Sequence, residues 1–505
     1  MTITDDQLWR VFELVRTQRW FAQKHLKASR VSVCDTVSFE CSDKASYTWL
    51  LLRVEPDDTV YSIVIKRGSD NAPVLASPRS LVEYVSRHGS VATNQGGAIL
   101  SSGGLEELDA AKMVPLEPCN SSNSLYSADL AETVCVAKFY RKMDAAGQRE
   151  RRTLSAMHAS GLTPRLYGAI EYHAPNRSEG HEPEILCLFL EKVHGRPAYE
   201  PFQDAARTAI ARLASGRGLS SVLSDHDVNL PQECATLGRL IADFHSAAGS
   251  VMPAAIAAQP FELAASIDAL ERRWARLAPM VRQSSIASDL SCLSPMSALA
   301  DIRTFETQSL TASYSHGDLH LSHIIFEQGH GYGRIIDPAH GVGEPHMTDN
   351  SARDLLQICR GFECFIFDEV ATYLAASLAK SRDDAGAFLA DPKNTHAAQW
   401  MRFAQRWSHA VFAKVLKAYV SAVPLELAQP VSDPAWRSVF YLERLLHELE
   451  YNIAYDRAFF LSSDIAFLRN FNSRAAALLP RTAAALRPQS AAECRSDKED
   501  AHVVH

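Results

Sequence analysis

The sequence has no excess of basic residues. Its 505 residues include 51 Lys and Arg against 59 Asp and Glu, which gives a net charge of −8 with histidine counted as neutral. Non-specific binding to nucleic acids requires a basic surface, because the phosphate backbone supplies much of the attraction. The charge balance therefore argues against a nucleic-acid partner.

Long hydrophobic runs and a secretory signal are also missing. No uninterrupted apolar run approaches the ~20 residues that a helix needs to cross a bilayer. Residues 1–7 contain two aspartates and no apolar core, unlike a signal peptide. We therefore expect no membrane partner and no export.

Paired cysteines are absent as well. The ten cysteines include no Cys-x-x-Cys pair, and several of them, such as Cys135 and Cys187, lie inside apolar runs. This usage predicts buried free thiols in a reducing compartment, rather than a disulfide framework or a zinc cluster. We expect the protein to be cytoplasmic.

Hydrophobic periodicity predicts an α+β protein that begins with a β-rich region. Residues 5–17 carry apolar side chains on one helical face, and strand-like segments follow at 31–33, 48–54 and 60–66. Residues 92–104 are rich in Gly and Ser, which predicts a loop or a seam, with a first domain boundary nearby.

The remainder of the chain divides into a second β-rich part and a long helical part. We expect strands at 113–116, 133–140 and 186–190, with one helix at 148–159. Amphipathic helical periodicity dominates from about residue 196. The expected organisation is an N-terminal cap (1–105), a β-rich lobe (106–195), a helical lobe (196–485) and a disordered tail (486–505).

A His-x-Asp motif carries the strongest chemical signal. His316-Gly-Asp318 is followed by two short apolar strands, and the second of them ends at Asp337. Asp318 could orient an attacking hydroxyl and accept its proton, while His316 braces the loop by hydrogen bonding. A plain turn is the alternative, because Gly-Asp pairs are common in turns. The second aspartate makes a phosphoryl-transfer site the stronger interpretation.

Asp337 is itself a candidate metal ligand. A carboxylate at the end of an apolar strand is costly unless it is paired or bound to a metal, and hard oxygen donors suit Mg²⁺. Because Pro338 follows, a helix N-cap is the alternative. The pairing with Asp318 favours the metal-ligand role.

Lys138 is a candidate phosphate ligand. It is the only charged residue in the apolar segment 134–140, and Glu150 in the following helix could hold it in place. This arrangement suits a lysine that binds the α- and β-phosphates of ATP. The alternative is a solvent-facing lysine on a strand with one polar face.

Two further segments fit a nucleotide site. Ser122, Asn123 and Ser124 lie between expected strands, where their hydroxyl and backbone N–H groups could bind phosphate oxygens. Glu191 and Val193 follow an apolar strand and would form the hinge whose backbone binds adenine. For this second segment, an ordinary exit from a strand is the alternative.

Taken together, these motifs resemble the maltokinase family, within the aminoglycoside-phosphotransferase-like kinases. The resemblance extends over most of the chain. It rests on five segments, Gln18-Arg-Trp-Phe-Ala-Gln-Lys24, Ser122-Asn-Ser124, Ala137-Lys-Phe139, His316-Gly-Asp-Leu-His-Leu321 and Leu442-Glu-Arg-Leu-Leu-His-Glu-Leu-Glu-Tyr451. The combination is specific, whereas each segment alone is not.

The resemblance implies a bilobal protein-kinase-like fold with an extra N-terminal cap. It further implies ATP- and Mg²⁺-dependent phosphorylation of the anomeric hydroxyl of maltose, giving maltose 1-phosphate. On that basis Asp318 is the catalytic base, and Asp337 and His323 occupy the metal-ligand positions. Seven residues are candidates for contact with the sugar acceptor, namely His316, His320, Glu344, Asp354, Glu443, Glu448 and Tyr451.

The chain departs from the family pattern at three places. Position 323 is His where the pattern has Gln or Asn, and Mn²⁺ tolerates nitrogen better than Mg²⁺ does. The segment 337–345 is three residues longer, with His340 and Glu344 at its edge. The C-terminal motif contains Arg444, His447 and Asn452 in place of Lys, Tyr and Glu. A kinase for another acceptor such as glucosamine therefore stays open, as does a nucleotide-binding pseudokinase, which His323 suggests.

Overall fold

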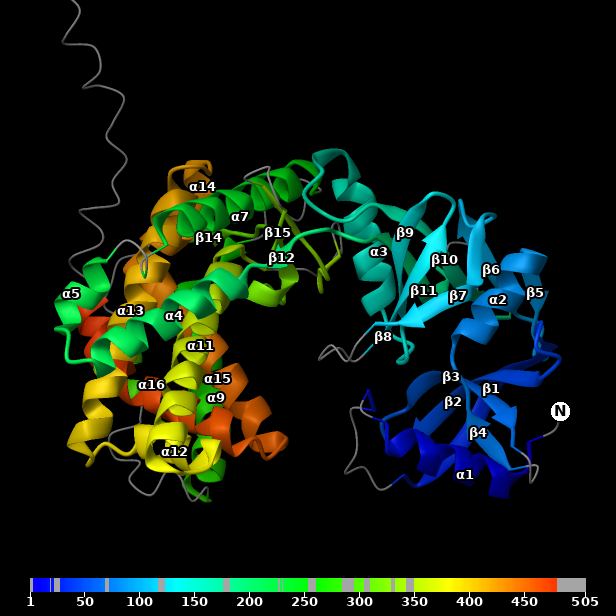
Figure 1. The fold of residues 1–505 in the computed structure, drawn as a ribbon, viewed down its shortest axis with the longest axis horizontal. Coiled ribbons are helices and arrows are strands. Elements are labelled where there is room, and N and C mark those ends of the chain that lie inside the picture. The colour runs from blue at the N-terminus through cyan, green and yellow to red at the C-terminus, as the bar shows by residue number, and fades with distance from the viewer. Residues whose placement is uncertain are drawn as a thin grey trace, which may run out of the picture. The chain divides into compact units, whose positions relative to one another are not determined.

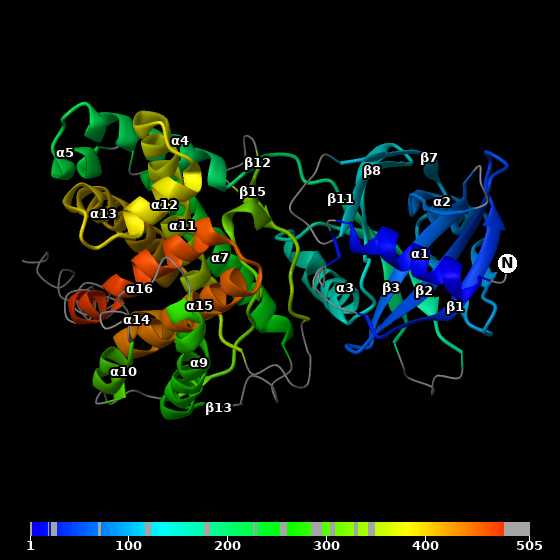
Figure 2. The same ribbon diagram turned by 90° about the horizontal axis from the view of Figure 1, so that it is seen from below.

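The structure is a computed structural model. It describes residues 3–18, 20–21, 28–68, 72–116, 123–175, 182–225, 228, 230–252, 260–283, 295–303, 309–327, 332–341 and 349–478. The chain divides into two compact units. Unit 1 consists of Met1–His194 and Pro338–Val342, and unit 2 consists of Gly195–Asp337 and Gly343–His505. Unit 1 is drawn mainly in blue and cyan, and unit 2 in green to red (Figures 1 and 2).

Unit 1 begins with a helix on a four-stranded sheet. Thr4 caps α1 (Asp5–Arg16) with a capping box, and the apolar face of this helix is buried. The antiparallel sheet has the order β1-β2-β3-β4, with bounds β1 Arg30–Glu40, β2 Ser46–Glu55, β3 Thr59–Arg67 and β4 Pro73–Leu75. Leu8, Val11 and Phe12 pack with Leu50 and Ile63 in one core. The helix and strands expected from the periodicity are confirmed.

A second sheet of seven strands completes unit 1. Its order is β5-β6-β10-β11-β9-β8-β7. The bounds are β5 Ser90–Ala92, β6 Ala98–Gly103, β7 Leu108–Pro115, β8 Ser124–Leu130, β9 Thr133–Phe139, β10 Leu166–His173 and β11 Glu184–Glu191. The helices of this part are α2 Arg79–His88, α3 Ala146–Met157 and the short η1 His158–Ser160. Side chains of α2 and of both sheets share a second core, which includes Trp49, Val82 and Phe139.

The loop expected at 92–104 is confirmed for residues 93–97, which connect β5 to β6, and wrong for residues 98–103. Residues 98–103 form β6, which pairs along its length with β10. Ile99 is fully buried, and Gly103 has a φ of 82° with the carbonyl of Tyr167 so close that no Cβ would fit. The small residues here permit close strand pairing rather than marking a loop.

Unit 2 is mostly helical. Its longer helices are α4 Tyr199–Ala214, α7 Pro231–Val251, α9 Leu263–Gln283, α11 Ala352–Leu378, α13 Thr395–Val420, α15 Pro434–Ala454 and α16 Ala458–Leu478. Shorter helices are α5 Leu219–Ser224, α10 Met296–Arg303, α12 Arg382–Ala390, α14 Leu425–Ser432 and the one-turn η2 Leu321–His323. The buried helix α11 runs through the middle of the unit and packs against α4, α13 and α15 (Figure 1).

Two small sheets complete unit 2. One has the order β12-β15-β16, with bounds Arg196–Pro197, Ile324–Phe326 and Gly333–Ile335. The other pairs β13 (Pro260–Phe261) with β14 (Leu310–Thr311). The antiparallel pair β15-β16 is the strand-turn-strand expected after the His-x-Asp motif.

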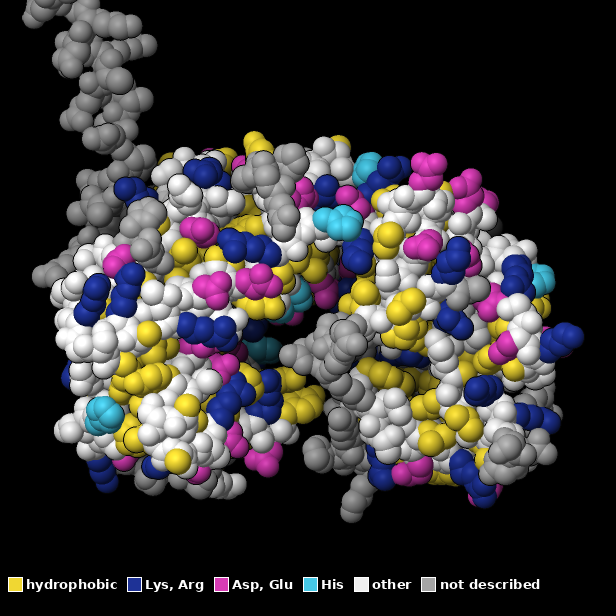
Figure 3. Space-filling model, viewed as in Figure 1, with side chains coloured by type: hydrophobic (Ala, Val, Ile, Leu, Met, Phe, Trp, Pro, Cys, Tyr) yellow, Lys and Arg dark blue, Asp and Glu magenta, His cyan; other side chains and the backbone are white. Residues whose placement is uncertain are grey.

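The overall class is α+β, with a β-rich N-terminal part and a helical C-terminal part, as the sequence predicts. The division of the first 195 residues at residue 105 stays a prediction, and the tail 486–505 lies outside the described residues. Among the helices that the structure describes, none has the length and apolar character needed to span a membrane. The described cysteines are free thiols. Figure 3 shows basic and acidic side chains interspersed on one face of the molecule.

Candidate active site

Lys138 and Glu150 form a buried ion pair in unit 1. Lys138 lies on β9 and Glu150 on α3, and Lys138 Nζ lies 2.5 Å from Glu150 Oε2. The two side chains are only 5% and 4% exposed. The hydroxyl of Tyr140 donates to the same carboxylate oxygen. A solvent-facing lysine is therefore excluded, and Lys138 is held in a fixed position by its partner.

The chain that follows Asp337 is attached to the helix that carries Glu150. The side chain of Arg149 donates from Nε to the carbonyl oxygen of Ala339 across 3.0 Å. The hydroxyl of Thr153 donates to the carbonyl oxygen of His340 across 2.8 Å. Pro338–Val342 accordingly belong to unit 1. Glu344 lies outside the described residues.

The predicted nucleotide segments lie at strand ends of unit 1. Ser124 is the first residue of β8, and its Oγ accepts a hydrogen bond from Arg141 Nε across 3.0 Å. Asn123 directly precedes it, while Ser122 lies outside the described residues. Glu191 is the last residue of β11, and its carboxylate accepts from the backbone N–H of Arg165.

The His-x-Asp loop of unit 2 is rigidly braced by His316. This side chain is fully buried, and its Nε2 donates to the carbonyl oxygen of Ile336 across 2.9 Å. Its Nδ1 accepts from the backbone N–H of Asp318 at 3.3 Å. Burial lowers the pKa of His316 to about 4, so the ring is neutral, as this hydrogen-bond pattern requires. The predicted bracing role is thus favoured over a contact with the acceptor.

Asp354, at the start of α11, holds the same loop through hydrogen bonds to its backbone. Its carboxylate accepts from the N–H groups of His316 and Gly317, at 2.5 and 3.1 Å. His245 Nε2 lies 3.0 Å from the same side chain, which is 1% exposed. A buried carboxylate with these partners is suited to holding the loop rather than to contacting the acceptor.

Asp318 presents its carboxylate from this braced loop. Gln357 on α11 donates from Nε2 to Oδ1 across 2.7 Å, whereas Oδ2 lies 3.8 Å from His320 Nε2. Burial alone would raise the pKa of Asp318. The nearby imidazoles, the Gln357 amide and the Arg444 guanidinium outweigh burial, so the net pKa is lowered from its ordinary value. An ionised carboxylate is the form that can accept a proton.

His323 faces the second aspartate. Its Nδ1 donates to the carbonyl oxygen of Asp318 across 2.8 Å, and its Nε2 lies 3.6 Å from Asp337 Oδ2. Asp337 has a φ of 62°, in the left-handed region where non-glycine residues are uncommon and which often marks functional sites. A carboxylate and an imidazole nitrogen could together hold a divalent cation. This donor pair suits Mn²⁺ better than Mg²⁺, which prefers oxygen.

The acceptor candidates on α15 are engaged in ion pairs. Glu443 binds Arg353 through two contacts of 3.0 Å each. Glu448 accepts from Arg360 Nε at 3.0 Å and from Arg444 Nε at 2.8 Å. Tyr451 is the exposed candidate, at 45%, and its ring packs against a neighbouring tyrosine. Glu443 and Glu448 therefore help to hold α15 on α11, and their contact with an acceptor stays a prediction.

A cavity of about 320 Å³ lies in unit 2 beside these residues. Its walls come from α9, α11 and α15 and include Ser266, Ala269, Arg353 and Glu443. Arg353 precedes Gln357 by four residues, so both lie on the same face of α11, one turn of about 5.4 Å apart. One wall of the cavity is therefore formed by a residue one turn before Gln357 on α11.

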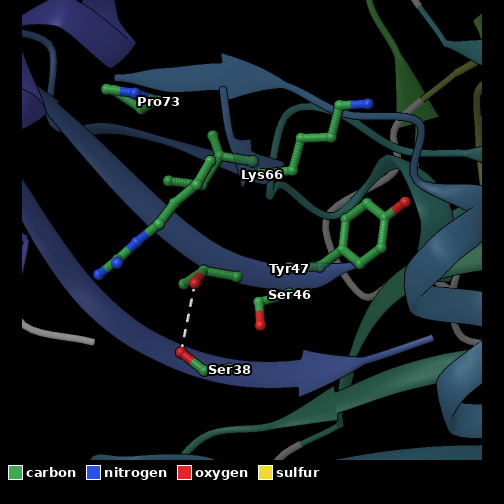
Figure 4. Close-up of a pocket in the computed structure, with 8 residues that line it drawn as sticks. Ser38, Ser46, Tyr47, Lys66 and Pro73 are labelled. Carbon is green, nitrogen blue, oxygen red and sulfur yellow. Dashed lines mark hydrogen bonds between the residues drawn. The ribbon is translucent and has the colours of Figure 1, made fainter. Parts of the chain in front are cut away.

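A second cavity, of about 280 Å³, lies on the first sheet of unit 1 (Figure 4). Ser38, Ser46, Tyr47 and Lys66 are among the residues that line it, and the hydroxyls of Ser38 and Thr48 are 3.2 Å apart. It contains none of the residues predicted for the site, and we assign it no role.

The most important residues missed from the sequence are Gln357 and His245. Gln357 belongs to a row of buried polar residues, Asp354, Gln357 and Arg360, at a spacing of three within an otherwise apolar helix. A buried polar row of this kind is costly unless it is hydrogen-bonded, so it could have signalled a site. His245 offers no comparable local signal, because its partner lies 109 residues away.

No model of a known protein family matches the sequence, and no curated protein matches it either. Among solved structures, the chain is similar to glucosamine kinase in complex with glucosamine, ADP and inorganic phosphate, with 16% identity, coverage of 90% of this chain and 97% of the other, and a TM-score of 0.48. Glucosamine kinase in crystal form B is 14% identical, with coverage of 90% of this chain and 98% of the other, and a TM-score of 0.49. A thermostable mutant of an aminoglycoside phosphotransferase, in its apo form, is 12% identical, with coverage of 73% of this chain and 94% of the other, and a TM-score of 0.34. At these identities and scores the likeness identifies neither a family nor a substrate, and the resemblance to maltokinases stays a prediction from the sequence motifs.

Proposed function

We propose that the chain is an ATP-dependent sugar kinase that phosphorylates the anomeric hydroxyl of maltose. The main support for this proposal is the loop of residues 316–318. Asp354 fixes the backbone of this loop, and Gln357 orients the carboxylate of Asp318. General base catalysis requires a carboxylate that is ionised and held in one orientation.

In the proposed reaction, the sugar hydroxyl attacks the γ-phosphorus of ATP and loses its proton to Asp318. The bond between the γ-phosphorus and the bridging oxygen breaks, and ADP leaves. Lys138, held by Glu150, binds the α- and β-phosphates. Ser122, Asn123 and Ser124 supply further phosphate contacts, and the backbone of 191–193 binds adenine.

A divalent cation, when bound, neutralises charge that develops on the transferred phosphoryl group. Asp337 and His323 would hold it in this chain. The left-handed backbone at Asp337 and the hydrogen bond that fixes the His323 ring support these roles. Mg²⁺ is the expected ion, with Mn²⁺ as the alternative.

The cavity between α9, α11 and α15 supports a disaccharide acceptor. Arg353 in its wall lies one turn before Gln357 on α11, so a disaccharide with one ring beside Asp318 could extend its second ring toward the cavity. Arg353 and Glu443 in its wall could both bond to sugar hydroxyls. Glu262 also lies in the wall, and its carboxylate could bind an ammonium group. That residue favours glucosamine as the second candidate.

The test is a panel of acceptors with ATP and either Mg²⁺ or Mn²⁺. Maltose, glucose, glucosamine and an aminoglycoside are each incubated with the full chain, and sugar phosphates are identified by phosphorus NMR. The proposal expects a phosphate on the anomeric oxygen of maltose. A product from glucosamine alone would establish the second candidate. If nucleotide binds but no acceptor is phosphorylated with either metal, the chain is a pseudokinase and the proposal is wrong.

A further inference from the structure

Two histidines and an aspartate converge at the tip of the His-x-Asp loop. His320 immediately precedes the one-turn 3₁₀ helix η2, and His323 is its last residue. Side chains three residues apart eclipse each other in a 3₁₀ helix. The two imidazole rings accordingly lie next to each other, with centroids 3.6 Å apart and ring planes inclined by 34°. Each offers a nitrogen that lies within 4.8 Å of the other and of an Asp318 oxygen.

The ring nitrogens are oriented as they are in metal sites. His323 uses Nδ1 for the carbonyl oxygen of Asp318, and His320 Nδ1 lies 2.6 Å from the hydroxyl oxygen of Ser322. In each ring the Nε2 atom is therefore the one that faces a carboxylate. Metal-binding histidines nearly always have the second nitrogen hydrogen-bonded in this way, because the bond fixes both the tautomer and the ring plane.

The separations of the donor atoms also suit a metal ion. His320 Nε2 lies 3.8 Å from Asp318 Oδ2, and one nitrogen of His323 lies within 4.8 Å of both residues' ligand atoms. Four ligands at about 2.0–2.1 Å in a tetrahedron are about 3.3 Å apart. Rotation of the three side chains would bring their ligand atoms from these separations to that distance. All three donors belong to unit 2 and to residues 318–323.

We propose that Asp318, His320 and His323 form a binding site for a zinc-class transition-metal ion. Imidazole nitrogen binds Zn²⁺ and Co²⁺ well, whereas Mg²⁺ prefers an all-oxygen environment. This set differs from the cation position between His323 and Asp337, although the two share His323. A zinc ion in the set would engage the carboxylate that the catalytic step requires.

A consequence follows that rests on the proposed function. Zinc bound by Asp318 occupies the oxygen that accepts the hydroxyl proton and removes His323 from the cation that accompanies ATP. Zinc is therefore an inhibitor of the transfer reaction rather than a substitute for Mg²⁺. The inhibition is relieved by a chelator, because the ligands are side chains and no covalent change takes place.

The test measures metal binding without nucleotide or sugar. Zn²⁺ is titrated calorimetrically into the full chain, and Co²⁺ binding is followed by its visible absorption. We compare the wild type with His320→Asn and with His158→Asn, a control on an exposed histidine of η1. The expected result is one site that weakens roughly 100-fold or more in His320→Asn and is unchanged in His158→Asn. Equal affinity in wild type and His320→Asn would overturn the proposal.

A second arm separates this inference from the proposed function. Phosphoryl transfer is measured with Mg²⁺ or Mn²⁺ while Zn²⁺ is added. Zinc binding that depends on His320 supports the metal site even if no acceptor is phosphorylated. Transfer that proceeds normally in a chain that binds no zinc would overturn the metal site and leave the kinase proposal standing.

Discussion

The side-chain amide of Gln357 donates a hydrogen bond to the carboxylate of Asp318 across 2.7 Å. The two residues are 39 positions apart, and they meet because Asp354, one turn earlier on α11, holds the backbone of the loop. One helix therefore fixes both the loop and the orientation of its carboxylate. This arrangement makes Gln357 a positioning residue for the proposed base.

Replacing Gln357 with Met tests this relationship. The variant keeps the size of the side chain but loses the amide donor, and hydrogen bonds to charged groups contribute about 1.5–3 kcal/mol. We expect kcat to fall roughly 10- to 100-fold, with little change in the KM for ATP. Gln203→Met is the matched control, because that amide bonds to Glu369 on the α4 side of α11. An equal loss of kcat in Gln203→Met would show that Gln357 has no specific role in orienting Asp318.

Lys138 should contribute separately to stability and to nucleotide binding. Lys138→Met leaves the Glu150 carboxylate buried without its cation, which typically costs about 3–5 kcal/mol. We expect the double variant Lys138→Met with Glu150→Met to regain most of the stability. Neither variant should show the rise in Tm that ATP gives the wild type. Retained stabilisation by ATP in the double variant would show that the pair is structural only.

Arg360 is the centre of a buried ion-pair network in unit 2. It is fully buried and contacts Glu363, Glu448 and Asp464 at 2.5 to 3.0 Å. Arg360→Met removes the cation that these carboxylates share, although Glu448 keeps its contact with Arg444, so we expect a loss of about 3–5 kcal/mol in the free energy of unfolding. The exposed Arg382, which pairs with Asp368, provides the control, and Arg382→Met should cost less than about 1 kcal/mol. Urea denaturation measures both, and similar losses would contradict the assigned importance of the network.

The cavity beside α9 can be filled to test its role in acceptor binding. Ala269→Phe would occupy the space of the second sugar ring. We expect kcat/KM for maltose to fall roughly 10- to 100-fold, with little effect on a monosaccharide acceptor. Ala264→Phe, also exposed on α9 but outside the cavity wall, serves as the control. An equal effect on maltose and on glucose would exclude the cavity as a disaccharide subsite.

Local sequence patterns predicted the elements whose signals are local. The apolar face of α1 at Leu8, Val11 and Phe12 is an example, because the spacing of these residues within one helix is enough to predict their burial in a core. Residues 98–103 were mispredicted because Ser and Gly are typical of loops. Their pairing with β10 depends on residues about 70 positions later, which no local pattern contains.

In the candidate site, too, contacts between residues close in the sequence were predicted, and contacts between distant residues were missed. Lys138 and Glu150 were predicted as partners because both lie near each other in the chain, on a strand and the following helix. Gln357 and His245 were missed, since their contacts with the loop depend on the packing of helices 39 or more residues away. For His316 and Asp354 only the structure could separate bracing from acceptor binding, because this depends on their burial.

The most direct test of the central claim compares the wild type with Asp318→Asn. Transfer of the γ-phosphoryl group from labelled ATP to maltose, glucose and glucosamine is measured together with ATP affinity. We predict labelled sugar phosphate from the wild type, a rate lower by roughly 10²- to 10⁴-fold in Asp318→Asn, and nearly equal ATP affinity in both. A variant that transfers phosphate to sugar as fast as the wild type would contradict the assignment of Asp318 as the base. A wild type that phosphorylates no acceptor would contradict the kinase itself.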